Sequence, residues 1–179
     1  MLNKIKYVVF FIAWFFLLSC NGGKSEKISR DKNDRATNDQ LMEINRLLIK
    51  KDQLKIQNYI SRAGWKMTET ETGLWYEILE QGDGPLVVSG TVVVLNYTLA
   101  LMEGKVCYSS DRLGPKEFLV GKGNVEAGLE QGVLLLREGA KARFVLPPHL
   151  AYGLPGDGNK IPARAILVYN VELVSVTRP

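Results

Sequence analysis

Hydrophobic and polar residues alternate in several runs from residue 70 onward, a pattern typical of β-strands with one buried face. The clearest run covers residues 91–102, in which Asn96 and Thr98 lie opposite an apolar face. Side chains two positions apart share one face of a strand, so this strand is expected to cover a core. The residues of its apolar face are Val93, Leu95, Tyr97, Leu99 and Leu101. Similar runs predict strands at 74–79, 116–120, 141–146 and 165–176.

A short helix is predicted between the third and fourth of these five strands, at about residues 125–133. Three apolar residues recur there at i, i+4 and i+8, on one helical face. They are Val125, Leu129 and Val133. Gly128 and Gly132 are spaced like small residues that let a helix lie close to a neighbour. Strands with a single helix late in the order predict an α+β fold, with a curled antiparallel β-sheet wrapped around one short helix.

The glycine-rich stretch at residues 121–132 raises the question of phosphate binding. A dinucleotide fingerprint needs G-x-G-x-x-G, and here the third glycine comes two residues too late. Leu129 and Glu130 stand where a P-loop requires Lys and Ser or Thr. We therefore expect no phosphate cradle, and interpret the helix as the lid or floor of an apolar pocket.

A second, longer helix is predicted before the strands, at residues 37–63 of a helical segment that covers 37–66. Thr37 to Gln40 reads as a capping box, and Gly64 supplies a stop. Two offset apolar stripes follow, interrupted by Lys50-Lys51-Asp52, so a regular coiled coil is not supported. The helix either packs on its own domain or docks a partner or a second copy, and both interpretations stay open.

The N-terminus has the layout of a secretory signal. Lys4 and Lys6 precede an apolar run at residues 7–18, which is shorter than the roughly 20 residues of a membrane span. The run ends in Leu17-Leu18-Ser19-Cys20, which resembles a bacterial lipobox. We expect a signal peptide at 1–19 and lipid attachment to Cys20. The polar, charge-mixed residues 20–36 are expected to form a flexible tether. We therefore expect the domain to lie in the bacterial cell envelope, lipid-anchored to the inner or outer membrane and facing the periplasm.

Charge and metal-ligating residues narrow the function classes. The net charge is +4, and Lys4 and Lys6 lie in the segment expected to be removed. Without a long basic run, nucleic-acid binding is not expected. His149 is the single histidine and has no acidic or cysteine cluster beside it, so neither a metal nor another cofactor is expected. The sequence does not predict the oligomeric state.

Eight segments in residues 70–179 together resemble the FKBP family of peptidyl-prolyl cis-trans isomerases in order and spacing. They are 94–98, 103–105, 109–110, 118–121, 125–132, 151–153, 161–162 and 165–173. The resemblance implies a folding factor that acts on proline-containing polypeptides without a cofactor. The order of lipobox, tether, helix and this domain is similar to that of exported FKBP lipoproteins of Bacteroidetes, including the gliding-motility-associated isomerase.

The resemblance also implies roles for individual residues. Tyr152 would donate its hydroxyl to a substrate carbonyl, the backbone N–H of Glu126 would bind a second carbonyl, and Leu129 would form the pocket floor. The implied apolar wall consists of Tyr97, Phe118, Val125, Ile161 and Tyr169.

This chain departs from the family pattern at several of these positions. The family usually has Trp where Leu129 stands, Phe at Cys107, Asp at Tyr108 and a second aromatic at Lys116. Tyr169 replaces the usual Phe, and its added hydroxyl needs a hydrogen-bond partner. The pocket is therefore expected to bind proline more weakly than a pocket with the usual family residues. The alternative function is a catalytically weak binding module or chaperone that supports envelope or gliding-motility machinery.

Overall fold

The structure is a computed structural model that describes residues 25–178, with side chains from residue 37 onward. The predicted signal peptide and Cys20 lie outside the described residues. The chain divides into two units, Met1–Arg46 and Leu47–Pro179. The second unit contains the sheet and all predicted pocket residues.

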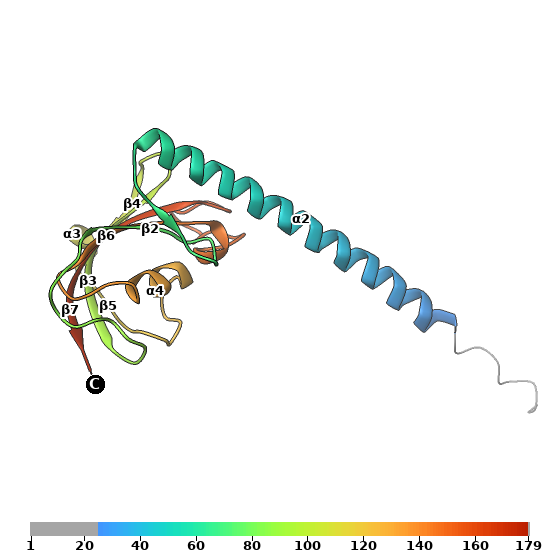
Figure 1. Ribbon diagram of the computed structural model, residues 1–179. Coiled ribbons are helices and arrows are strands. Elements are labelled where there is room, and N and C mark those ends of the chain that lie inside the picture. Colours follow the sequence, from blue (N-terminus) through green and yellow to red (C-terminus); the bar gives the residue numbers. More distant parts are fainter. Residues whose placement is uncertain (1–24, 179) are drawn as a thin grey trace, which may run out of the picture. The chain divides into compact units, whose positions relative to one another are not determined.

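A seven-stranded antiparallel sheet forms the second unit (Figure 1). Its strands run in the order β1-β2-β6-β7-β3-β4, and β5 also pairs with β3. β5 pairs with the N-terminal half of β3 and β4 with the C-terminal half, so they share one edge of β3. The strands are β1 (Thr68–Glu69), β2 (Trp75–Glu80), β3 (Val92–Leu101), β4 (Val106–Ser109), β5 (Lys116–Leu119), β6 (Lys141–Leu146) and β7 (Leu167–Thr177).

The long strand β3 has the predicted alternation, since its buried and partly exposed residues follow one another with period two. It pairs with β7 along its whole length, with Tyr97 opposite Val171 and Leu99 opposite Tyr169. The buried faces of the two strands thus form one continuous wall. The predicted α+β fold, with a curled antiparallel sheet around a short helix, is confirmed (Figure 1).

The short helix α4 (Ala127–Val133) lies against β6, and its two glycines make this possible. A Cβ atom on Gly128 would lie 2.6 Å from Cγ of Leu146, and one on Gly132 would lie 2.8 Å from Cε2 of Phe144. Both distances are shorter than carbon atoms tolerate, so the helix approaches the strand as closely as its backbone permits. The prediction from the glycine spacing is confirmed.

The helix α2 (Ser25–Ala63) begins earlier than predicted. Thr37 lies within it and is not its N-cap, and residues 25–36, predicted as part of a tether, are helical. A helix that has already been nucleated extends at small cost per residue, which explains why weak local signals did not mark its start. Among the described residues, no helix is both long and apolar enough to cross a membrane.

The C-terminal part of α2 packs on the face of the sheet opposite to α4. Ile56 and Ile60 are buried there against Val145, Ile166 and Val168. The interpretation as a helix packed on its own domain is therefore confirmed for this part.

An ion pair also links this part of α2 to the segment before β7. The buried Asp52 accepts a hydrogen bond of 2.6 Å from Arg164 in the segment before β7. The helix is thus tied to the same loop region that carries Ile161.

The sequence analysis did not predict four short elements. They are β1, β4, α3 (Ser110–Leu113) and the 3-10 turn η1 (Pro148–Leu150). None is longer than four residues, and so short a segment does not repeat often enough to show a period.

Candidate functional site

The predicted wall and floor residues come from separate elements and meet beside α4. Leu129 and Tyr169 are fully buried, and Ile161, Phe118 and Tyr97 retain exposed fractions of only 2%, 6% and 8%. The rings of Tyr97 on β3 and Tyr169 on β7 lie 6.0 Å apart and are tilted by 48°. These residues belong to one apolar cluster, against which Val125, Tyr108 and Tyr152 also pack. The structure thus brings the predicted apolar residues together.

A buried carboxylate lies inside this apolar cluster. The side chain of Glu126, at the N-terminus of α4, accepts hydrogen bonds from the hydroxyl of Tyr152 at 2.5 Å and from that of Tyr169 at 2.9 Å, both on Oε1. Its other oxygen, Oε2, accepts a hydrogen bond from Nζ of Lys116 at 3.4 Å. Glu126 therefore supplies the partner that the added hydroxyl of Tyr169 needs. The sequence had assigned a role only to its backbone N–H.

The charge of Glu126 is stabilised by its surroundings. Burial favours the neutral acid, but the Lys116 ammonium and the hydroxyls of Tyr152 and Tyr169 outweigh it, so the pKa of Glu126 lies below its ordinary value. Its own backbone amide adds to this lowering of the pKa. Burial and the Glu126 charge in turn raise the pKa values of Tyr152 and Tyr169. Both hydroxyls therefore stay protonated.

Lys116 lies over the two aromatic rings of the wall. Its Nζ is 5.2 Å from the ring centre of Tyr97 and 5.7 Å from that of Tyr169, within the range of cation–π attraction. It also donates to the Tyr169 hydroxyl at 3.3 Å. An ammonium thus stands where the family has an aromatic ring, and it neutralises the buried carboxylate.

Tyr108 and Cys107 on β4 contact the loop at residues 157–161. The hydroxyl of Tyr108 donates a short hydrogen bond to the carboxylate of Asp157. That carboxylate also accepts the backbone N–H groups of Asn159 and Ile161, each at 2.8 Å. A carboxylate, on Asp157, therefore lies next to Tyr108, and the sequence analysis did not identify it.

The thiol of Cys107 is buried and lies 3.5 Å from the carbonyl oxygen of Lys160. Burial, the largest influence, raises its pKa, which keeps the thiol protonated. This agrees with an inert apolar side chain rather than a nucleophile.

The backbone N–H groups of the glycine-rich loop before α4 bind a carboxylate of the chain itself. Oε1 of Glu130 accepts the backbone N–H groups of Gly121, Lys122 and Gly123 at 2.7, 3.1 and 3.2 Å. Successive N–H groups that converge in this way form an anion-binding nest. The chain's own carboxylate fills it, which agrees with the expectation that this stretch holds no phosphate.

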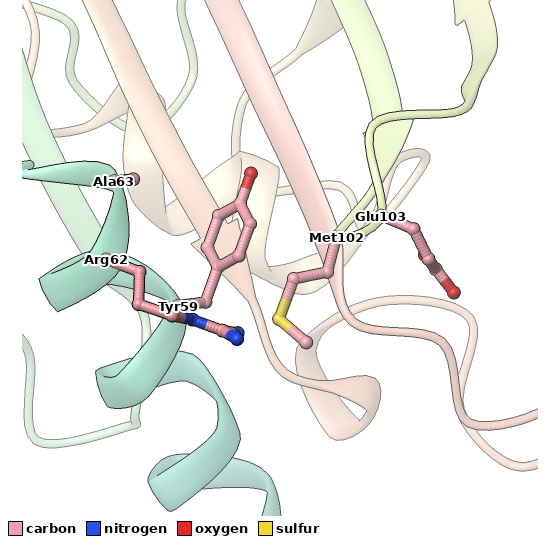
Figure 2. Close-up of a pocket in the computed structure, with 5 residues that line it drawn as sticks. All are labelled: Tyr59, Arg62, Ala63, Met102 and Glu103. Carbon is pink, nitrogen blue, oxygen red and sulfur yellow. The ribbon is translucent and has the colours of Figure 1, made fainter.

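A separate hollow of about 520 Å³ lies beside the end of α2 (Figure 2). Tyr59, Arg62 and Ala63 of the helix line one side, and Met102 and Glu103 after β3 line the other. None of the predicted site residues lines it. Within residues 37–178, no group of three or more His, Cys, Asp or Glu side chains is arranged to hold a metal ion, and His149 lies 3.0 Å from the carbonyl oxygen of Thr72.

Comparisons with known proteins identify the family and the fold. The model of the family described as FKBP-type peptidyl-prolyl cis-trans isomerase matches residues 84–174. An FKBP-type peptidyl-prolyl cis-trans isomerase FkpA of Aeromonas hydrophila is 37% identical over 131 residues, which cover 72% of this chain and 48% of that protein. FK506-binding protein 2 of Dictyostelium discoideum is 42% identical over 89 residues, 49% of this chain and 67% of that protein. The chain thus spans about half the length of its bacterial relative.

Solved structures agree as well. The crystal structure of FkpA from Escherichia coli matches with a TM-score of 0.63 and 25% identity, over 99% of this chain and 83% of that one. The crystal structure of AtFKBP13 matches with a TM-score of 0.58 and 32% identity, over 62% of this chain and 98% of that one. This chain belongs to the family of FKBP-type peptidyl-prolyl cis-trans isomerases.

Proposed function

We propose that this protein catalyses the cis–trans isomerisation of X-Pro bonds in exported proteins. The observation that carries the proposal is the convergence of Tyr97, Phe118, Leu129, Ile161 and Tyr169 beside α4. This is the set of positions at which the family resemblance places the proline-binding pocket.

The reaction needs no nucleophile and no metal. Rotation about a peptide bond has a barrier of about 18–20 kcal/mol, and uncatalysed prolyl isomerisation takes roughly 10–100 s. The twisted imide has lost its resonance and much of its charge separation, so water stabilises it less than the planar form. An apolar pocket removes this preference for the planar form, and a positioned donor that binds the twisted imide more tightly lowers the barrier further.

The floor of the pocket decides how strongly proline is held. A buried aromatic side chain contributes roughly 150–250 Å² of area, worth about 4–6 kcal/mol at about 25 cal/mol per Å². Leu129 is smaller than an aromatic side chain and is fully buried, so we expect weak binding of proline peptides with turnover retained.

The test is cis-to-trans exchange of a short Leu-Pro peptide, followed by NMR with the purified full chain in detergent. We expect exchange faster than in buffer alone, and unchanged by Val174→Ala, a substitution at an exposed position of β7. An exchange rate equal to the uncatalysed rate would refute the proposed isomerase activity.

A binding or chaperone function, for envelope or gliding-motility machinery, is the second candidate. The observation that favours it is a series of apolar side chains on α2 that are more than half exposed: Leu41, Met42, Ile44, Leu47 and Leu54. This function predicts that Leu41→Ser with Ile44→Ser impairs the cellular phenotype and that Tyr152→Phe does not. The opposite pattern would exclude it.

Lipid anchoring at Cys20 in the bacterial cell envelope completes the proposal. It is supported by the lipobox-like Leu17-Leu18-Ser19-Cys20 after a short apolar run. We expect Cys20→Ser to move the protein out of the membrane fraction and to abolish labelling with a fatty-acid analogue. Membrane fractionation that is unchanged in this variant would refute the anchor.

A further inference from the structure

The hydroxyl protons of Tyr152 and Tyr169 are already used within the protein. A tyrosine has one O–H to donate. Tyr152 and Tyr169 both give theirs to Oε1 of Glu126, at 2.5 and 2.9 Å. Hydrogen bonds to a charged acceptor are about twice as strong as neutral ones. A substrate carbonyl would have to displace a buried carboxylate to receive the Tyr152 proton.

Lys116 has a donor to spare. An ammonium has three N–H bonds, and the structure directs two of them, to Oε2 of Glu126 at 3.4 Å and to the hydroxyl oxygen of Tyr169 at 3.3 Å. The Lys116 side chain is 24% exposed, whereas that of Glu126 is 5% exposed. Of this ion pair, the ammonium is therefore the part that an entering ligand reaches.

The position of the ammonium also fits contact with a bound proline. It lies over the rings of Tyr97 and Tyr169, two residues that the family resemblance places in the pocket wall. These contacts hold Nζ against residues at which the family resemblance places the bound proline ring.

We propose that Lys116 is the catalytic hydrogen-bond donor to the bound X-Pro segment, and that Glu126, Tyr152 and Tyr169 position its ammonium. The proposal rests on the isomerase function and deepens it, since it moves the donor role from Tyr152 to Lys116. In the twisted imide the nitrogen lone pair is no longer delocalised, so it accepts a hydrogen bond that the planar imide cannot. A fixed cation in an apolar site stabilises such a state preferentially. No covalent bond is made or broken, and the lysine keeps its proton.

Four variants of the full chain separate this role from the others. Lys116→Met keeps the length and removes the donor, and Lys116→Arg keeps a cation. Tyr152→Phe removes the donor that the family resemblance implies. Lys141→Met is the matched control, because Lys141 is a lysine of β6 whose ion pair with Glu80 lies on the surface.

The readouts are kcat/KM for a Leu-Pro peptide and the Kd for the same peptide from NMR shift titration. We expect Lys116→Met to lower kcat/KM at least tenfold, Lys116→Arg to restore it to within about threefold of wild type, and Lys141→Met to leave it unchanged. Tyr152→Phe should lower kcat/KM less than Lys116→Met does, because the Tyr152 substitution removes a contact to Glu126 and not one to the substrate. Wild-type kcat/KM in Lys116→Met, or a larger loss in Tyr152→Phe, would overturn the proposal.

Lys116→Met leaves Glu126 buried without its counter-charge, which endangers folding. The double variant Lys116→Met with Glu126→Leu removes both charges, and it should stay as impaired as the single variant. Recovery to wild-type activity would show that the ammonium only neutralises the carboxylate, and would overturn the proposal. If the wild-type chain shows no turnover, the isomerase function fails, and the role of Lys116 is then decided by Kd, which Lys116→Met must weaken.

Discussion

Replacing Gly132 with alanine tests whether α4 depends on a bare backbone at its contact with β6. The new Cβ would lie 2.8 Å from both Cε2 and Cζ of Phe144, a side chain that is itself fully buried. Forcing extra volume into a packed core costs about 1–3 kcal/mol. Alanine gains about 0.5–1 kcal/mol over glycine in a helix, so the net effect is a loss of up to about 2.5 kcal/mol in the free energy of unfolding.

Urea unfolding of Gly132→Ala and wild type measures this loss as a lower midpoint at an unchanged m-value. Phe144→Leu removes the ring atoms that the new methyl group meets. In that background Gly132→Ala should cost less, and the difference is the coupling energy of the contact. If Gly132→Ala instead raised the free energy of unfolding, helix propensity would dominate and the close approach of α4 to β6 would not be needed.

Three further predictions concern titratable groups. The Cys107 thiol should react with a thiol reagent such as DTNB at mildly alkaline pH only at the rate of unfolding, and at once in urea, because burial raises its pKa and blocks access. Since the pKa of Glu126 is lowered on folding, its stabilising effect is present near neutral pH and is lost as pH falls through the folded-state pKa. Urea unfolding from about pH 7 to about pH 3 should therefore show a steeper loss of stability for wild type than for Glu126→Gln. Glu130→Gln should lower the free energy of unfolding by about 1–2 kcal/mol, because its carboxylate accepts three backbone N–H groups; a thermal melt equal to that of wild type would contradict this.

The sequence predicted those parts of the fold that repeat along the chain. Alternation over ten or more residues identified β3 and β7, and the glycine spacing predicted the close packing of α4. The family resemblance identified the apolar residues that meet at the site. The boundary of α2 was missed because helix extension depends weakly on local composition.

The polar half of the site could not be predicted in the same way. Its contacts join residues far apart in the sequence: Glu126 and Tyr169 are separated by 43 positions, and Tyr108 and Asp157 by 49. No local period connects such pairs. The one available signal was the added hydroxyl of Tyr169, which indicated a missing partner without naming it.

The substitutions that distinguish this pocket form two connected sets. Lys116 and Tyr169 both bind Glu126, while Cys107 and Tyr108 both contact the loop at 157–161. In a pocket that is losing its function, we would expect substitutions to leave some buried polar groups without hydrogen-bond partners. Each such group lowers the free energy of unfolding by about 1–3 kcal/mol. Among the described residues, the one buried side-chain polar atom without a partner is Nε1 of Trp75, which belongs to the separate cluster under α2. The polar replacements at Lys116, Tyr169 and Tyr108 are instead each paired with a carboxylate, on Glu126 or Asp157. We therefore expect that replacing Lys116 or Glu126 alone lowers the free energy of unfolding more than replacing both, because a single replacement leaves a buried group without its partner.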